Sequence, residues 1–140
     1  MTGLYLEDLA LGQSAERAHT VTDQDIRAFA EVSGDNNPVH LDEEFAATTP
    51  FKSRIAHGML SAGYISALLG TQLPGPGAIY LSQTMNFKRP VRIGDEVTTK
   101  AVVSAIDPER ARVTLDVVCE VAGKPVVDGQ AVVMVPKRAA

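Results

Sequence analysis

A short polar stretch of the chain carries the residue types that acid–base chemistry needs. The stretch is Ser33-Gly34-Asp35-Asn36-Asn37-Pro38-Val39-His40. The carboxylate of Asp35 and the imidazole of His40 lie five residues apart on a bent loop, so they can converge on one water molecule. The same residues also suit an ordinary tight loop, in which Asp35 and Asn37 bond the backbone and His40 lies at the surface. Residue types alone leave both interpretations open.

A second polar cluster, Ile55-Ala56-His57-Gly58-Met59-Leu60, is predicted to begin a helix. The first N–H groups of a helix have no intrahelical partner and can hold an oxygen on which negative charge develops. Gly58 would leave its N–H open to such an oxygen, although a glycine here can also serve packing alone. His57 is compatible with a cap or a packed ring.

The helix that follows is predicted to be buried in a protein core rather than in a membrane. No Asp, Glu, Lys or Arg occurs between residues 55 and 87. The apolar part, from Gly58 to Gly70, is shorter than the roughly 20 residues that a bilayer crossing requires. Because this helix has no polar face, we expect other elements to cover it on nearly every side.

The second half of the chain is predicted to form an antiparallel sheet. Thirteen of the 16 Val residues follow residue 90, and β-branched side chains favour strands. Apolar residues alternate over 79–87, 97–103 and 113–121, and a less regular run over 126–135 is predicted to be covered on both faces. Gly- and Pro-containing gaps of hairpin length separate the runs.

The first half of the chain is predicted to hold two small helices. One is capped by Thr22 and runs to about Val32, and a shorter one follows Asp42. The predicted fold class is therefore α+β, with one long central helix packed on an antiparallel sheet.

Composition bounds the class of protein. The 140 residues are 45% hydrophobic and 21% charged, which predicts one globular domain over residues 1–140. A net charge of −4 disfavours nucleic-acid binding. The single Cys119 cannot form an internal disulfide or a cysteine-based zinc site. The first residues show no signal-peptide pattern, so we expect a cytoplasmic protein with no membrane contact.

Together the motifs resemble the MaoC-like hydratases, and most closely the single-domain (R)-specific enoyl-CoA hydratases. The resemblance extends from residue 22 to about residue 97. Its matching stretches are 33–40, 51–60, Leu73-Pro74-Gly75-Pro76-Gly77 with Tyr80-Leu81, and Phe87-Lys88-Arg89-Pro90-Val91 with Gly94-Asp95.

The resemblance implies a hot-dog fold, in which the sheet wraps the long helix, and a homodimer that binds an acyl thioester near the subunit interface. It implies that Asp35 and His40 are the catalytic pair and that the Gly58 amide binds the thioester carbonyl. Ser66 on the helix, Asn37 in the loop and His57 are expected to support the site or to contact substrate.

The function that the resemblance implies is reversible hydration of trans-2-enoyl-CoA to (R)-3-hydroxyacyl-CoA, with no cofactor. No metal is expected, since Asp35, His40, Asp42 and His57 make a thin ligand set. The alternatives are a 3-hydroxyacyl dehydratase acting on acyl carrier protein, a hot-dog acyl-CoA thioesterase, and a non-catalytic acyl-binding subunit. Basic residues either contact the CoA phosphates or lie solvated at a strand end: Lys52, Arg54, Lys88, Arg89 and Arg92.

Overall fold

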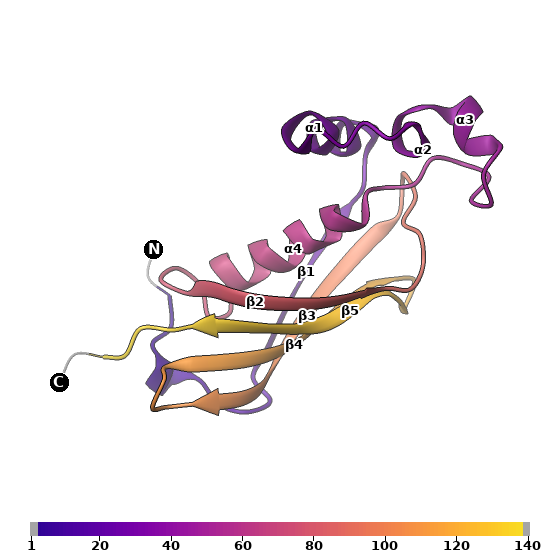
Figure 1. Cartoon of the computed structure of the whole chain (residues 1–140). Helices are drawn as coiled ribbons and strands as arrows, with labels where there is room; N and C mark the ends of the chain where they lie inside the picture. The colour runs from indigo at the N-terminus through magenta and orange to yellow at the C-terminus, as the bar shows by residue number, and fades with distance from the viewer. Residues whose placement is uncertain (1–2, 139–140) are drawn as a thin grey trace.

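A computed structural model describes residues 3–138, in which a five-stranded antiparallel sheet packs against one long helix, α4 (Figure 1). The strand order is β1-β3-β4-β5-β2. The strands are β1 (Ser14–Thr20), β2 (Ile79–Phe87), β3 (Glu96–Asp107), β4 (Arg112–Val121) and β5 (Lys124–Met134). The helices are a 3-10 turn η1 (Leu6–Asp8), α1 (Asp23–Ser33), α2 (Pro38–Leu41), α3 (Glu43–Ala47) and α4 (Gly58–Thr71). The predicted α+β class is confirmed.

The core lies between α4 and the inner face of the sheet. Strands β3 and β4 bury every second side chain over residues 96–103 and 112–119, as their alternating apolar pattern predicts. Their buried residues pack on Ile65, Leu68 and Leu69 of α4, all of which are almost fully buried. In β5, Val126 and Val127 are both buried and alternation begins afterwards, so the prediction of a run covered on both faces holds only for its start.

One face of α4 remains uncovered, which corrects the expectation of a helix wrapped on nearly every side. Met59 is 57% exposed, and Gly63, Ser66 and Gly70 lie on the same open side. Three of the alternating apolar residues of β2 are exposed as well, namely Ile79, Leu81 and Phe87, with Phe87 also at 57%. The physical reason is that β2 is an edge strand, so no further strand extends the sheet over this side of α4.

Three elements escape prediction from the pattern, namely the short turn η1, strand β1 and helix α2. Strand β1 has the sequence SAERAHT, whose charges hide its alternation, and it pairs only with β3 at the other edge of the sheet. Such polar edge strands are common because charge protects an unpaired edge. Helix α2 is a single turn within the stretch that was expected to be a loop.

Helices α1, α2 and α3 gather beyond the start of α4 (Figure 1). Helix α1 begins at the predicted Thr22 cap, where Thr22 and Asp25 bond each other's backbone N–H, and it ends at Gly34 with a φ of 81°. Helix α3 follows the Asp42 cap as predicted. No helix among residues 3–138 is long and apolar enough to span a membrane.

Candidate active site

The loop between α1 and α2 is held by its own side chains. Asp35 Oδ1 accepts a hydrogen bond from the N–H of Asn37 at 3.3 Å, and Asn37 Oδ1 accepts one from the N–H of Val39 at 3.1 Å. Asn37 thereby caps α2, and both side chains are exposed. The backbone role expected of an ordinary loop is therefore real, but it occupies only one carboxylate oxygen of Asp35.

His40 is buried, which contradicts the interpretation that places it at the surface. Its Nδ1–H donates to the carbonyl oxygen of Ile55 at 2.8 Å, because a carbonyl can only accept. The Nε2 atom consequently carries the free lone pair that a general base needs. Burial lowers the pKa of His40 below its ordinary value of 6.5, since it disfavours the charged imidazolium.

The segment before α4 holds the loop in place. The N–H of Ile55 donates to the carbonyl of Val39 at 3.3 Å, and Arg54 Nε donates to the carbonyl of His40 at 2.7 Å. The guanidinium of Arg54 also bonds Asp23 at 2.6 Å, and its side chain is only 11% exposed. The Arg54 guanidinium is thus largely buried and bonded within the protein. Neither of the two interpretations of the basic residues, contact with CoA phosphates or solvation at a strand end, applies to Arg54.

His57 brings the two polar clusters together. Its ring stacks on that of His40, with centroids 3.8 Å apart and planes inclined by 27°. One ring nitrogen of each histidine and a carboxylate oxygen of Asp35 all lie within 4.8 Å of one another. Two groups this far apart can share a water molecule, because each hydrogen bond spans about 2.8 Å.

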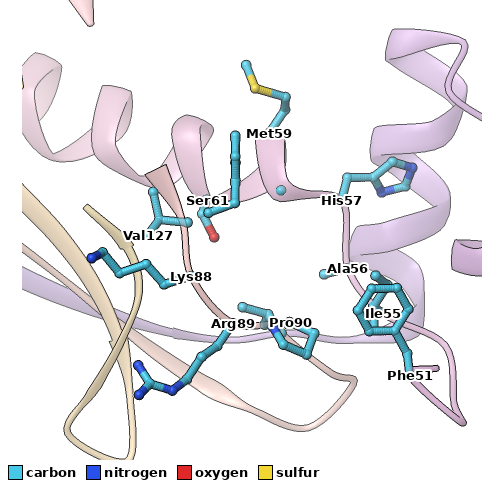
Figure 2. Close-up of a pocket in the computed structure, with 13 residues that line it drawn as sticks. Phe51, Ile55, Ala56, His57, Met59, Ser61, Lys88, Arg89, Pro90 and Val127 are labelled. Carbon is cyan, nitrogen blue, oxygen red and sulfur yellow. The ribbon is translucent and has the colours of Figure 1, made fainter. Parts of the chain in front are cut away.

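An apolar cavity of about 480 Å³ opens beside the start of α4 (Figure 2). Gly58 forms part of its wall, and the Phe87 ring lies so close that a Cβ atom at residue 58 would be 2.6 Å from Cε1. The first N–H groups of α4 emerge here without a helical partner. The wall comprises Phe51, Ile55, Ala56, His57, Gly58, Met59, Ser61, Phe87, Lys88, Arg89, Pro90, Val91 and Val127.

Only some of the predicted site residues line the cavity. His57 and Gly58 line this cavity, whereas Asp35, His40 and Asn37 do not. Asp35 and His40 contact His57 in its wall. Ser66 is exposed two turns further along α4 and is not part of the wall. Ser61, in contrast, is part of the wall and is buried.

The cavity wall holds side chains that sequence patterns did not single out or left undecided. Ser61 follows Gly58 at the i, i+3 spacing of one helix face, a signal that could have found it. Of the basic residues, Lys88 and Arg89 line the cavity on the side away from His57 (Figure 2). Arg92 instead donates to the carbonyl of Phe51.

Asp35, His40 and His57 form the kind of set that can bind a transition metal. Metal ligands point their lone pairs at one centre, whereas stacked rings direct theirs side by side. One nitrogen of each ring is also bonded to a carbonyl oxygen. This geometry favours water over a metal ion, and the absence of a metal stays a prediction.

Comparison with known proteins identifies the family. The sequence profile of the MaoC like domain matches residues 9–133. This chain belongs to the MaoC-like domain family. It is 58% identical over 134 residues to the (R)-specific enoyl-CoA hydratase of Rhodospirillum rubrum, covering 96% of this chain and 93% of that protein. It is 53% identical over 135 residues to the 3-hydroxybutyryl-CoA dehydratase of Methylorubrum extorquens, covering 96% and 86%.

Solved structures confirm the hot-dog fold of this MaoC-like protein. The unliganded R-hydratase of Pseudomonas aeruginosa superposes with a TM-score of 0.92 at 48% identity, over 97% of this chain and 88% of that one. The match to the family extends beyond the short motifs and includes β1, the strand that the sequence pattern concealed.

Proposed function

We propose that this MaoC-like protein is an (R)-specific enoyl-CoA hydratase, a hydro-lyase that adds water reversibly to a trans-2-enoyl thioester. The observation that carries the proposal is the convergence of Asp35, His40 and His57 within 4.8 Å beside the first N–H of α4. High identity to an enzyme of this name over nearly the whole chain supports the same conclusion.

The geometry accounts for each requirement of the reaction. Hydration places oxygen on C3 and a proton on C2 while negative charge develops on the thioester oxygen. Asp35 and the bare Nε2 of His40 hold one water, take its proton as the oxygen attacks, and deliver a proton to C2 from the same side. The Gly58 N–H stabilises the thioester oxygen. The largely apolar cavity next to Gly58 suits the acyl chain.

A competing activity would use the same fold differently. A thioesterase directs water at the carbonyl carbon and releases CoA, and it does not require a paired Asp and His. A dehydratase acting on acyl carrier protein would run the same chemistry in reverse, and Lys88 and Arg89 at the cavity suit the phosphates of either carrier. A non-catalytic acyl-binding subunit would not need Asp35 and His40.

The decisive assay follows crotonyl-CoA by loss of its enoyl absorbance while a thiol reagent reports free CoA. Loss of absorbance without thiol release, with (R)-3-hydroxybutyryl-CoA as the product, is expected. Thiol release would instead establish a thioesterase, and an inert crotonyl-CoA would overturn the proposal. Parallel assays with crotonyl-acyl carrier protein compare the two carriers through kcat/KM.

The decrease of kcat/KM at low pH tests whether His40 acts as a neutral base. Because burial lowers its pKa, His40 should remain a neutral base as pH falls from about 8 to 6.5, so kcat/KM should fall only below 6.5. The titratable groups that face it are Asp35, which raises this pKa, and His57, which lowers it, and the charged Arg54 bonds the His40 carbonyl. An acid limb above pH 6.5 in the pH profile of kcat/KM would contradict this environment.

A homodimer is expected, because the exposed face of α4 and the edge strand β2 form one apolar surface. Met59 of α4 and Leu81 of β2 line the same shallow groove. Strand β2 contains no charged residue, so nothing protects its free edge from pairing with another strand. Sedimentation equilibrium at micromolar concentration should give a dimer, and Leu81→Glu should shift the protein towards the monomer. A wild-type monomer would contradict this proposal.

Two further properties complete the proposed function. We expect no cofactor, because acid–base catalysis on bound water requires none. The cytoplasm is the expected compartment, and cell fractionation with an antibody against the protein tests it.

A further inference from the structure

We propose that His57 is a positioning residue, whose Nε2–H holds the Asp35 backbone and whose ring holds the His40 ring, so that both stay aligned with the Gly58 amide. The inference rests on the proposed hydratase function and assigns a task to a side chain that its mechanism does not use. His57 takes no part in proton transfer here. It acts through Asp35 and His40.

His57 contacts residues of α1, of the loop that carries Asp35 and of α2. Its Nε2 lies 2.9 Å from the carbonyl oxygen of Asp35, a contact that spans 22 residues of sequence. One side of the ring stacks on His40, and the ring of Phe29 from α1 packs at 4.7 Å with a 48° inclination. The side chain is only 3% exposed. His57 also directly precedes Gly58, so the residue that holds the loop is covalently joined to the proposed oxygen-binding amide.

His57 is not an ordinary helix cap. It occupies the N-cap position of α4, but its side chain makes no capping hydrogen bond. In Figure 2 its ring points away from Ser61 and Val127, towards the helical ribbon opposite. The side chain thus bonds the catalytic loop instead of the helix that it precedes.

The bonding partners fix which ring nitrogen of His57 carries the hydrogen. The Asp35 carbonyl can only accept, so Nε2 carries the hydrogen. Nδ1 is buried and has no hydrogen-bond partner among residues 3–138. The ring therefore serves as an Nε2–H donor with a flat face.

Two substitutions separate the donor from the flat ring. His57→Gln places an amide N–H near the position of Nε2 but removes the ring. His57→Phe keeps a ring that can stack but removes the donor and leaves the Asp35 carbonyl unpaired. A displacement of about 1 Å at reacting groups can cost about 10²-fold in rate, so we expect His57→Phe to lower kcat by about that factor with a smaller change in KM. His57→Gln should retain kcat within about tenfold of the wild type.

The order of kcat between His57→Phe and His57→Gln distinguishes a positioning role of His57 from a space-filling role. If His57 only fills space, Phe should be tolerated better than Gln, and that order would overturn the proposal. His19→Phe is the matched control, because His19 also packs on an aromatic ring, that of Tyr64, and also bonds through Nε2, here to the Asp25 carboxylate, but lies outside the cavity wall. Its kcat should stay near that of the wild type. Circular dichroism and thermal unfolding establish that each variant is folded.

A spectroscopic measurement on the wild type does not depend on variants or activity. Nitrogen NMR of the histidine side chains, recorded on the neutral form of His57, should show the proton on Nε2 and not on Nδ1. The opposite tautomer would overturn the inference. If crotonyl-CoA is not hydrated, the proposed function fails while this result stands. If hydration proceeds and both variants match the wild type, only the His57 inference fails.

Discussion

Asp35→Asn and His40→Gln should each lower kcat for hydration of crotonyl-CoA by on the order of 10²–10⁴, with little change in KM. Asp35→Asn keeps the shape of the side chain, including an oxygen for the Asn37 N–H, but loses the negative charge that favours proton removal. His40→Gln loses the bare Nε2 lone pair. Neither side chain lines the cavity proposed for the acyl chain, so substrate affinity should change little.

The double variant tests whether Asp35 and His40 act as a unit. If both hold the same water, Asp35→Asn combined with His40→Gln should be hardly slower than the slower single variant. Losses that multiply, or a single variant with near-normal kcat, would mean that the loop serves structure alone. Asp42→Asn is a suitable control, since the Asp42 side chain caps α3 through the N–H of Phe45 and keeps an oxygen for this bond in the variant. Circular dichroism must show that all variants are folded.

Gly58→Ala should lower kcat/KM by about 10²-fold, because the start of α4 has no room for a side chain. The added Cβ would lie 2.6 and 2.7 Å from two atoms of the Phe87 ring. Since Phe87 is 57% exposed, its ring can turn aside, and the variant should fold. Either the Phe87 ring turns or the start of α4 shifts. Both movements change the shape of the cavity and the position of the Gly58 amide. Steady-state kinetics at several enoyl-CoA concentrations measures the loss.

A double-mutant cycle locates the origin of this loss. Phe87→Ala removes the atoms that the new methyl group meets, so the pair should lose less than the sum of the two single effects on the free-energy scale. Gly70→Ala is the control on the same helix, because a Cβ there meets nothing within 4 Å. A Gly58→Ala enzyme with normal kcat/KM would contradict the proposed role of the Gly58 amide.

The features that could be predicted from sequence have local signals. Thr22, Asp25 and Gly34 bound α1 because capping and left-handed backbone depend on residues a few positions apart. Asp35 and His40 were candidates because their short spacing on a loop allows convergence. The apolar α4 and the alternating β3 and β4 follow from hydrophobic periodicity.

The features that could not be predicted depend on contacts between distant residues. Arg54 reaches 14 residues back to His40 and 31 residues back to Asp23, so its burial has no local signature. The contact of His57 with Asp35 is equally remote in sequence. The exposed face of α4 escaped prediction for another reason: apolarity indicates that a face will be covered, but it does not indicate which chain covers it.

The face of the double bond that receives a proton tests the central claim most directly, namely that Asp35 and His40 hold one water that supplies both oxygen and proton. Hydration of crotonyl-CoA in D₂O should place one deuterium on C2, on the same face as the new oxygen on C3. The coupling between the C2 and C3 protons of the released 3-hydroxybutyrate distinguishes this product by NMR, and chiral analysis should give the (R) form. Deuterium on the opposite face or on both faces would contradict a single water held by this pair, whereas an (S) product would contradict the (R) assignment.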